Sequence, residues 1–370
     1  MKKIKIRFLI NTLNYGGAEK CLIDLLNNFN DQQYEVCLMV VNGGAFSSEV
    51  PTHVQYKELV SSKIKNKKIY KLLTKIVYKM PATLFKILFL RKRYDIECAY
   101  MQGFATRAIS KLTKRKGVKT YTFVHTDLSK TNFIARYYPS KEKCLKEYGK
   151  FSKVCFVSKT AKIGFEKAVG LLDNASIVHN VIDKKRIIQA SKEECSWEFS
   201  TNGLKLITVG RLIEAKNYTS LLRICAQLEK EFDFELFIVG DGEERKKLED
   251  LIKEDSIKSV KLIGFARNPY PLLRKADLFV CSSIREGYST AVVEALTLGL
   301  PVITTDVSGM DEILDNGKYG MIVANNEVDL YNGLRLILGN QEVFKKLQEK
   351  AKQYDMFNKK NSFNEYKSLF

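Results

Sequence analysis

Along the whole chain, short runs of apolar residues alternate with longer stretches in which apolar residues recur every three or four positions. The short runs predict buried β-strands, and the longer stretches predict helices with one apolar face. Strands are expected at residues 4–10, 35–41, 96–101, 119–124, 153–158, 204–209, 234–239, 260–263, 277–282, 301–304 and 321–323. Helices are expected at about residues 17–29, 69–79, 105–116, 142–149, 160–168, 217–230, 243–254, 270–275, 290–298, 310–314, 327–338 and 341–353. Such alternation is typical of parallel α/β architecture.

The chain divides into two halves of different charge. Residues 183–202 are polar enough for a linker, and 370 residues fit two domains of ordinary size. Residues 1–185 contain 35 Lys and Arg against 14 Asp and Glu, whereas residues 186–370 contain 26 against 28. The net charges are therefore +21 and −2. This asymmetry points to an anionic partner for the first domain alone.

The beginning of the chain is basic but lacks the pattern of a targeting signal. Lys5 and Arg7 interrupt its apolar positions, so the segment predicts a strand rather than a signal peptide. No apolar run approaches the length of a membrane span. The eight cysteines show neither a CxxC pair nor metal-ligand spacing, which favours a reducing compartment. We therefore expect a cytoplasmic protein.

The most informative segment runs from Cys281 to Ala295, where a strand ends in a small-residue loop and a helix begins near Thr290. Glu286 lies in the loop, and Glu294 lies one turn inside the helix. The amino end of a helix carries unpaired N–H groups and partial positive charge, which suit a phosphate. Carboxylates accept several O–H donors and suit a hydroxyl-rich ligand. Together these features predict a nucleotide-sugar site.

This segment also carries a family resemblance. Glu286-Gly287-Tyr288-Ser289-Thr290 running to Glu294, followed by Gly299-Leu300-Pro301-Val302-Ile303-Thr304-Thr305, resembles glycosyltransferase family 4, whose signature is two glutamates with seven residues between them. That family consists of retaining enzymes with the GT-B fold. Ser289 stands where the family often has Gly or Pro, which leaves the donor sugar open.

The resemblance implies a domain plan. A GT-B enzyme has two Rossmann-like, doubly wound domains that face each other across a cleft, with C-terminal helices crossing back to the first domain. Residues 1–185 would form the acceptor-side domain, which is basic and faces a membrane. Residues 186–350 would bind the nucleotide sugar. Residues 351–370 would form a terminal helix that packs on the first domain.

A second charged motif follows the strand at residues 204–209. Arg211 and Lys216 bracket a short loop, and Asn217 could cap the next helix. In doubly wound sheets, ligands bind at the carboxyl ends of strands, where this loop falls. Two solvated surface charges are the simpler alternative in so basic a chain. The resemblance gives Arg211 and Lys216 the role of binding the pyrophosphate.

Smaller motifs complete the candidate site. Gly16 and Gly17 follow the first strand, either as a plain turn or, by resemblance, as the glycine loop of the family. His125 ends a strand, where a lone histidine is often structural, but the family places a histidine there facing the donor sugar. Phe265 lies in the segment that the family holds near the base. The resemblance thus assigns catalysis to Glu286, His125, Arg211 and Lys216. It assigns donor binding to Gly16, Gly17, Arg211, Lys216, Phe265, Gly287, Tyr288, Ser289, Thr290 and Glu294.

The segment from Leu59 to Tyr94 contains eleven Lys and Arg and no Asp or Glu. Apolar residues recur in it at helical spacing, with lysines on another face, which predicts a basic amphipathic helix. Anionic lipid would attract these residues. An ordinary helix that faces the core with a solvated lysine face is the alternative, and both can hold at once. The expected membrane contacts are Lys68, Lys71, Lys75, Lys79, Arg91, Lys92 and Arg93.

The resemblance implies a retaining hexosyl- or N-acetylhexosaminyltransferase that uses a UDP-sugar without cofactor or metal. Its acceptor would be a polyprenyl-diphosphate-linked saccharide for a surface polysaccharide. The enzyme would work in the cytoplasm, peripherally bound to the inner face of the cytoplasmic membrane. Alternatives are another GT-B enzyme, such as an epimerase or phosphorylase, or a membrane- or nucleic-acid-binding protein with an inactive domain. No nucleic-acid partner is expected, because no recognition-helix, RRM or zinc-finger pattern occurs.

Overall fold

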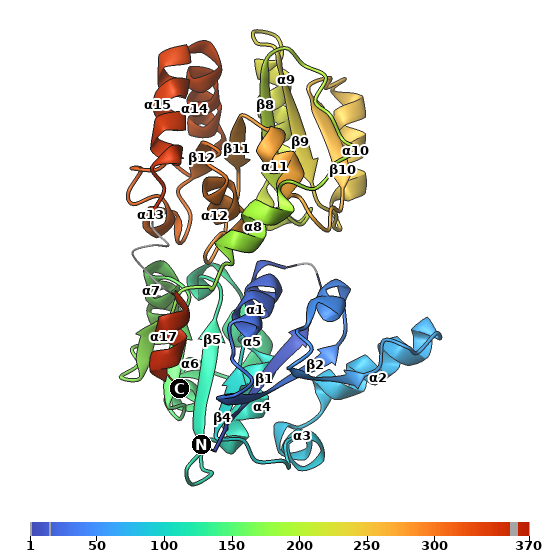
Figure 1. The fold of residues 1–370 in the computed structure, drawn as a ribbon, viewed down its shortest axis with the longest axis vertical. Coiled ribbons are helices and arrows are strands. Elements are labelled where there is room, and N and C mark those ends of the chain that lie inside the picture. The colour runs from blue at the N-terminus through green and yellow to red at the C-terminus, as the bar shows by residue number, and fades with distance from the viewer. Residues whose placement is uncertain (1, 15, 356–361, 370) are drawn as a thin grey trace. The chain divides into compact units, whose positions relative to one another are not determined.

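The computed structural model describes residues 2–14, 16–355 and 362–369. The chain forms two compact units, one of Met1–Ile182 with Asn361–Phe370 and one of Asp183–Lys360 (Figure 1). Of the terminal helix expected at 351–370, residues 356–361 and 370 lie outside the described residues. Helix α17 (Ser362–Leu369) belongs to the first unit, as predicted for C-terminal helices of this fold.

The first unit is built on a parallel sheet. In the described part of the chain, the sheet has seven strands in the order β3-β2-β1-β4-β5-β6-β7. The strands are β1 (Ile4–Thr12), β2 (Tyr34–Asn42), β3 (Gln55–Val60), β4 (Ile96–Ala99), β5 (Lys119–Val124), β6 (Lys153–Phe156) and β7 (Ala175–Ile177). The helices besides α17 are α1 (Gly17–Asn27), α2 (Lys67–Lys79), α3 (Ala82–Phe89), α4 (Phe104–Ile109), α5 (Phe133–Tyr137), α6 (Lys141–Tyr148) and α7 (Lys159–Ala168), with short 3₁₀ turns at Ala45–Glu49, Ser110–Leu112 and Leu128–Lys130. Phe8 and Leu9 of β1 enter different hydrophobic clusters, so both faces of the sheet are covered.

The second unit repeats this plan. Among the described residues, its parallel sheet has six strands in the order β10-β9-β8-β11-β12-β13. The strands are β8 (Leu204–Val209), β9 (Phe234–Val239), β10 (Val260–Gly264), β11 (Leu278–Cys281), β12 (Val302–Thr305) and β13 (Met321–Val323). The helices are α8 (Lys184–Ala190), α9 (Tyr218–Leu228), α10 (Arg245–Glu254), α11 (Tyr270–Lys275), α12 (Thr290–Thr297), α13 (Met310–Ile313), α14 (Glu327–Gly339) and α15 (Gln341–Lys352), with a 3₁₀ turn at Glu214–Lys216. Strand order reverses between β8 and β11, which is where doubly wound sheets bind ligands.

Several short elements were not predicted from the sequence, among them strand β7 and helices α3 and α5. Strand β3 was not predicted because only Val60 of its six residues is buried, so it lacks an apolar run. The expected linker 183–202 begins with helix α8. Asp183 caps that helix by accepting a hydrogen bond from the backbone N–H of Arg186 at 3.0 Å, and Ile187 is buried. A polar composition can therefore hide a short capped helix.

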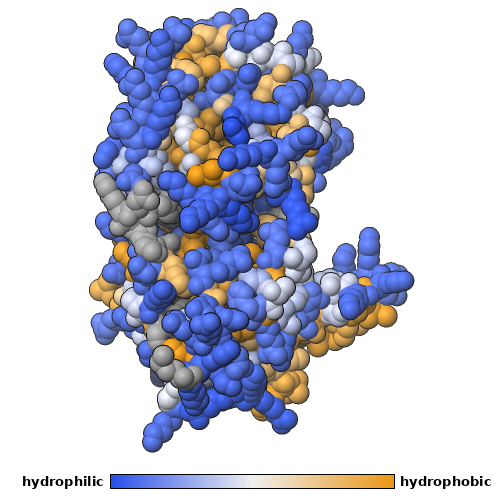
Figure 2. Space-filling view, viewed as in Figure 1, coloured by the Kyte–Doolittle hydropathy of each residue, from blue (hydrophilic) through white to orange (hydrophobic). Residues whose placement is uncertain are grey.

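Helix α2 buries little of its apolar face, and α3 beside it exposes apolar residues as well. The alternative of a helix packed through its apolar face on the core is wrong, because Val77 is the one buried residue of α2. Figure 2 shows hydrophobic surface along α2 and over α3. Seven large apolar side chains there are between 38% and 58% exposed, namely Ile69, Leu72, Leu73, Ile76, Leu84, Ile87 and Leu88.

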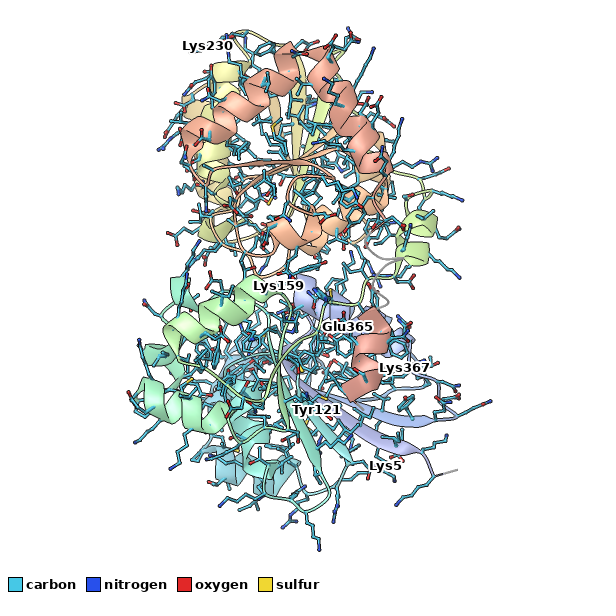
Figure 3. All side chains as sticks on the ribbon, turned by 90° about the vertical axis from the view of Figure 1, so that its left-hand side faces the viewer. Lys5, Tyr121, Lys159, Lys230, Glu365 and Lys367 are labelled. Atoms are coloured by element: carbon cyan, nitrogen blue, oxygen red, sulfur yellow. The ribbon has the colours of Figure 1, made fainter. Side chains whose placement is uncertain are left out.

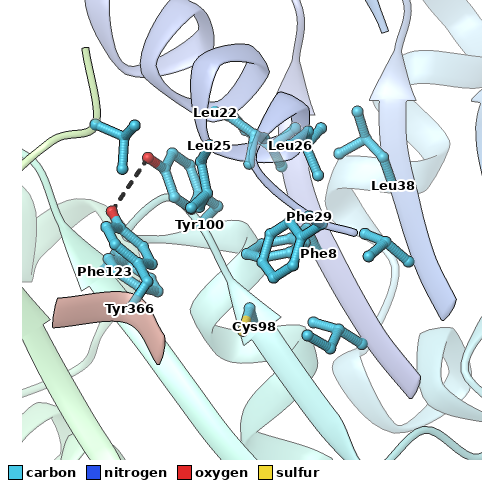
Figure 4. Packing of buried hydrophobic residues seen from close by; sticks show 14 of the residues in the cluster. Phe8, Leu22, Leu25, Leu26, Phe29, Leu38, Cys98, Tyr100, Phe123 and Tyr366 are labelled. Carbon is cyan, nitrogen blue, oxygen red and sulfur yellow. Dashed lines mark hydrogen bonds between the residues drawn. The ribbon is translucent and has the colours of Figure 1, made fainter. Parts of the chain in front are cut away.

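Helix α17 is part of the core of the first unit. Figure 3 shows Glu365 on this helix and Tyr121 of β5 near it. The Tyr366 ring stacks on Phe123 with centroids 5.5 Å apart, and its hydroxyl shares a 3.4 Å hydrogen bond with that of Tyr100 (Figure 4). The Glu365 carboxylate accepts a 2.8 Å hydrogen bond from the backbone N–H of His179. These contacts fix the last turns of the chain on the first sheet.

A buried ion pair crosses the centre of that sheet. Arg7 of β1 and Glu97 of β4 are register partners, with side chains 1% and 0% exposed. The Arg7 Nε and Nη2 atoms donate to the two Glu97 oxygens at 2.8 and 2.6 Å, and Nη2 also donates to the Lys92 carbonyl. Burial raises the pKa of Glu97, although Arg7 opposes the shift. Because each charge is out of water, each depends on the other.

We expect Glu97→Ala to destabilise the first unit by about 3 to 5 kcal/mol, because it leaves the Arg7 guanidinium buried without a carboxylate. Replacing both partners by apolar residues, as in Arg7→Met with Glu97→Leu, should restore most of this loss. Glu35→Ala is the matched control, since Glu35 pairs with Lys5 and Lys92 in partly exposed bridges that contribute about 1 kcal/mol or less. Urea unfolding followed by circular dichroism measures all four proteins. Equal midpoints for Glu97→Ala and Glu35→Ala would contradict the assignment.

Candidate active site

The loops that follow β8, β11 and β12 meet at the carboxyl edge of the second sheet. Strands β8 and β11 flank the point where strand order reverses, and β12 is the neighbour of β11. Parallel strands deliver their following loops to one edge, so residues far apart in the sequence come together there. Lys216 and Glu286, predicted separately from two loops, are in direct contact at this edge.

The Lys216–Glu286 contact is a short ion pair at the centre of the site. Lys216 Nζ lies 2.6 Å from Glu286 Oε1, and the two side chains are 20% and 12% exposed. The Ser283 hydroxyl donates to the same carboxylate oxygen at 2.8 Å. Glu286 is therefore held by two donors while remaining accessible to solvent at the edge of the sheet.

Three further hydrogen bonds join the loops around this pair. The backbone N–H of Ile284 donates to the Ala215 carbonyl at 2.9 Å. The Ser282 hydroxyl donates to the Lys216 carbonyl at 2.8 Å. The Thr305 hydroxyl, at the end of β12, donates to the Ser283 carbonyl at 2.6 Å. The ion pair is thus built into a network in which both backbones are fixed, which preorganises its charges.

The ion pair also sets the charge of the lysine. Burial lowers the pKa of Lys216, but attraction to the Glu286 carboxylate outweighs burial, so the pKa lies above the ordinary value for lysine. Lys216 is therefore an ammonium at neutral pH. The adjacent Tyr218 is buried, and burial raises the pKa of its hydroxyl to about 12, so it is neutral. The site presents a fixed positive charge.

Glycines allow the neighbouring loops to approach this edge closely. Gly240 has a φ of 149°, and a Cβ there would lie 1.9 Å from the Gly210 carbonyl oxygen. A Cβ on Gly242 would lie 2.3 Å from the Leu212 carbonyl oxygen. The backbone N–H of Leu212 donates to the Asp241 carbonyl at 3.0 Å. The segment 240–242 therefore supports the loop that carries Arg211.

Glu294 lies on α12 and is 5% exposed. The Tyr270 hydroxyl, from α11, donates to its Oε1 at 3.4 Å. At the start of the same helix, Ser289 occupies the N-cap position without making a side-chain capping hydrogen bond. The first-turn N–H groups of α12 are thus not used by their own cap residue, which suits an anion.

Other predicted residues are placed less tightly. Arg211 is exposed, and no ion pair joins it to either glutamate within the part of the chain that the structure describes. Asn217 does not cap α9 with its side chain, contrary to prediction. It adopts a left-handed conformation with a φ of 53°, which asparagine tolerates better than most residues. Phe265 follows β10 and is 39% exposed. Gly287, Tyr288 and Thr290 lie in the Glu286 loop and at the start of α12.

The predicted residues of the first unit lie at the carboxyl edge of the first sheet. His125 follows β5, and both of its ring nitrogens are buried without a hydrogen-bond partner among the described residues. Burial lowers the pKa of His125 to about 4, so the imidazole is neutral at pH 7. Gly16 is the N-cap of α1 in an extended conformation, and Gly17 begins the helix. The Glu19 carboxylate lies over Gly16, so the amino end of α1 already faces a negative group.

Sequence reasoning missed Ser283, Thr305 and Tyr270, which hold the two glutamates and their loops. Each is a common residue at an ordinary position, and no spacing pattern marked it. Among the described residues, no cluster of three or more His, Cys, Asp or Glu could hold a metal ion. In that same part of the chain, no helix is both long and apolar enough to span a membrane.

Comparisons with known proteins relate this chain to glycosyltransferases. Residues 191–354 match the family model of glycosyl transferases group 1. The chain is 27% identical to N-acetylgalactosamine-N,N'-diacetylbacillosaminyl-diphospho-undecaprenol 4-alpha-N-acetylgalactosaminyltransferase of Campylobacter jejuni, over 94% of each chain. A second Campylobacter jejuni enzyme, named as an alpha-1,4-N-acetyl-D-galactosaminyltransferase acting on a diNAcBac-PP-undecaprenol-linked saccharide, is 25% identical over 95% of this chain and 93% of its own length.

A solved structure shows the same fold. HepE of Anabaena, crystallised with UDP and glucose, superposes with a TM-score of 0.73 at 20% identity, over 99% of this chain and 100% of that one. The predicted two-domain architecture is thereby confirmed. Residues 191–354 are thus similar to the group 1 glycosyltransferases, and the chain has the GT-B fold.

Proposed function

We propose that the enzyme retains anomeric configuration while moving a hexosyl or N-acetylhexosaminyl group from a UDP-sugar to a polyprenyl-diphosphate-linked saccharide. The product would serve a surface polysaccharide of the capsule, exopolysaccharide or O-antigen type. The Lys216–Glu286 contact beside α12 carries the donor half of this proposal. Two Campylobacter relatives named for undecaprenol-diphosphate-linked acceptors support the acceptor half. The UDP complex of HepE supports the nucleotide.

The leaving diphosphate would be stabilised by charge rather than by a metal. An ammonium has three N–H donors, so Lys216 can keep one on Glu286 and turn others toward phosphate oxygens. Arg211 is exposed on the same loop and can add a bidentate contact. The amino end of α12 supplies backbone N–H groups. Donors that are fixed before the reaction lower the barrier to the departure of a dianionic group.

Glu286 and Glu294 would bind different parts of the donor, the sugar and the ribose. Glu286, held by Lys216 and Ser283, would orient the donor sugar as oxocarbenium character develops at its anomeric carbon. Glu294, whose carboxylate is fixed by Tyr270, would accept hydrogen bonds from the ribose hydroxyls. With no carboxylate assigned as a nucleophile, the acceptor hydroxyl would attack on the face that the diphosphate leaves. A neutral His125 can donate or accept a hydrogen bond with a hydroxyl of the donor sugar.

Single replacements test this assignment. Arg211→Ala, Lys216→Ala, Glu286→Ala and Glu294→Ala should each lower kcat about a hundredfold, since one lost charge-stabilising contact costs roughly 3 kcal/mol. Glu286→Gln separates lost charge from lost packing, and it should also lose most activity. Glu214→Ala, which removes an exposed carboxylate from the same loop, is the control and should retain activity. Circular dichroism checks folding. Full turnover in either Glu286 or Glu294 variant would remove the central assignment.

The reaction itself is tested by a donor and acceptor panel. Purified enzyme should release UDP from one UDP-sugar only when a polyprenyl-diphosphate-linked saccharide is added, and NMR of the product should show the anomeric configuration of the donor. Release of nucleotide from GDP- or ADP-sugars instead would change the proposed nucleotide. An epimerised sugar formed without acceptor would overturn the transferase proposal.

We further propose that the enzyme is cytoplasmic and binds the inner face of the cytoplasmic membrane peripherally, through the basic surface of the first unit. Lys68, Lys71, Lys75 and Lys79 are exposed along α2, where they can approach anionic headgroups. Arg91 is exposed as well. Lys92 and Arg93 contribute less, because Lys92 pairs with Glu35 at 3.0 Å and Arg93 donates to the Lys116 carbonyl. The charge asymmetry of the chain supports this partner.

Replacing the four α2 lysines by glutamine should weaken binding to phosphatidylglycerol-containing vesicles at low salt and slow transfer to a lipid-linked acceptor. Transfer to a soluble acceptor analogue should scarcely change. The matched control replaces Lys230, Lys253, Lys345 and Lys346, four exposed lysines of the second unit, by glutamine. Co-sedimentation at two salt concentrations measures binding, because salt screens surface charges. If the unaltered protein ignores anionic vesicles at low salt, the lysines are only a solvated face.

A further inference from the structure

Helix α2 has three faces instead of the two that its sequence suggested. Successive residues of a helix turn by about 100°, and this spacing separates the side chains into three stripes. One stripe faces the first unit and contains Tyr70, Thr74 and Val77. A second carries the lysines. The third is apolar and exposed, and it contains Ile69, Leu72, Leu73 and Ile76.

Helix α2 already packs on the first unit through its inner stripe, so the apolar stripe is not the face that contacts the core. The Asn42 side-chain amide donates to the Thr74 hydroxyl at 2.7 Å. The Tyr78 hydroxyl donates to the Asn11 carbonyl at 3.2 Å, and its ring lies 5.1 Å from that of Phe104. These contacts fix α2 in rotation about its own axis. The apolar stripe therefore points away from the first unit by construction.

Helix α3 repeats the arrangement. Phe85 is fully buried, with its ring 5.2 Å from that of Phe104. Leu84, Ile87 and Leu88, at spacings of three and four residues, share the opposite, exposed side. Figure 2 shows this hydrophobic surface beside that of α2. Exposed large apolar side chains that gather on neighbouring helices mark a surface that is covered by something else.

We propose that α2 and α3 insert their apolar stripes into the interfacial region of a lipid bilayer, so that membrane binding has a hydrophobic component besides the electrostatic one. This inference deepens, and rests on, the proposed membrane partner. Helix α2 has thirteen residues and spans about 20 Å, too short to cross a hydrocarbon core of about 30 Å. Helices that carry apolar residues on one side and lysines on the flank lie in the membrane plane.

Charge selects the bilayer over a second copy of the chain. Between Leu59 and Tyr94 there are eleven Lys and Arg and no acidic residue. A symmetric dimer through this face would bring the lysines of two copies together, and like charges across an interface oppose association. An anionic bilayer offers both a negative surface for the lysines and an apolar layer for the stripe. An anionic bilayer thus accounts for both the lysines and the apolar stripe.

The contacts that hold α2 on the first unit also indicate which edge of the sheet would lie near the bilayer. Asn11 and Asn42 are near the carboxyl ends of β1 and β2, the edge at which His125 follows β5. Insertion of α2 would bring the membrane surface beside this edge. A saccharide carried on a polyprenyl diphosphate would then reach the first unit without leaving the bilayer. The inserted helices would select acceptors by their lipid anchor.

The test replaces Leu72, Ile76, Ile87 and Leu88 by serine in the full chain. The control replaces Ile163, Leu171, Val328 and Leu336 by serine, four exposed apolar residues elsewhere on the surface. Vesicles of phosphatidylcholine, with and without phosphatidylglycerol, are sedimented with each protein at moderate salt. The first variant should lose at least tenfold in binding to both vesicle types, and the control should bind like the unaltered protein. Thermal melts followed by circular dichroism verify that both variants fold.

A second readout reports the position of the stripe. Leu72→Trp in a Trp197→Phe background should show a blue-shifted emission that brominated acyl chains quench. Equal binding by the two serine variants, or no quenching, would overturn insertion. Sedimentation velocity without lipid supplies another decisive outcome, since dimerisation that the Leu72, Ile76, Ile87 and Leu88 replacements abolish would make a second copy the occupant. None of these measurements requires sugar transfer, so failure of the proposed reaction would leave them unaffected and would be seen separately.

Discussion

The contact between Lys216 and Glu286 is the constraint on which the second unit's site depends. The two residues lie 70 positions apart and are joined by a 2.6 Å ion pair, with Ser283 on the same carboxylate. The pair raises the pKa of Lys216 against the effect of burial, and so keeps this lysine positively charged. A charge that is fixed before a diphosphate arrives needs little reorganisation when that diphosphate leaves.

The first unit supplies a different kind of environment. Its carboxyl edge carries a neutral histidine, His125. Hydrogen bonds of Asn11 and Asn42 link this edge to the surface helix α2, which has one basic and one apolar stripe. Its own sheet is held by the buried Arg7–Glu97 pair and by α17. The account we propose places the donor site on the second unit and lipid contact on the first, in keeping with the net charges of −2 and +21 of the two halves.

The sequence predicted most strands because buried strands of a parallel sheet are continuous apolar runs. The prediction failed for β3 and β7, in which Val60 is the one buried residue. It predicted Glu286 and Glu294 from their spacing around a helix start. The Lys216–Glu286 contact could not be predicted from pattern, since it depends on which loops the sheet brings together. For α2, periodicity identified the residues that share a face but gave no information on what covers that face. The exposure of Leu72 and Ile76 required the structure.

The central claim is that the charged edge of the second unit recognises the donor through its diphosphate. Calorimetric titration of the full chain with UDP and with uridine tests it most directly, because the two ligands differ only in the phosphates. We expect UDP to bind at least tenfold more tightly, a difference of about 1.4 kcal/mol or more, and we expect this difference to vanish when Arg211 and Lys216 are both alanine. Equal affinities for UDP and uridine in the unaltered protein, or a difference that persists in the double variant, would contradict the account.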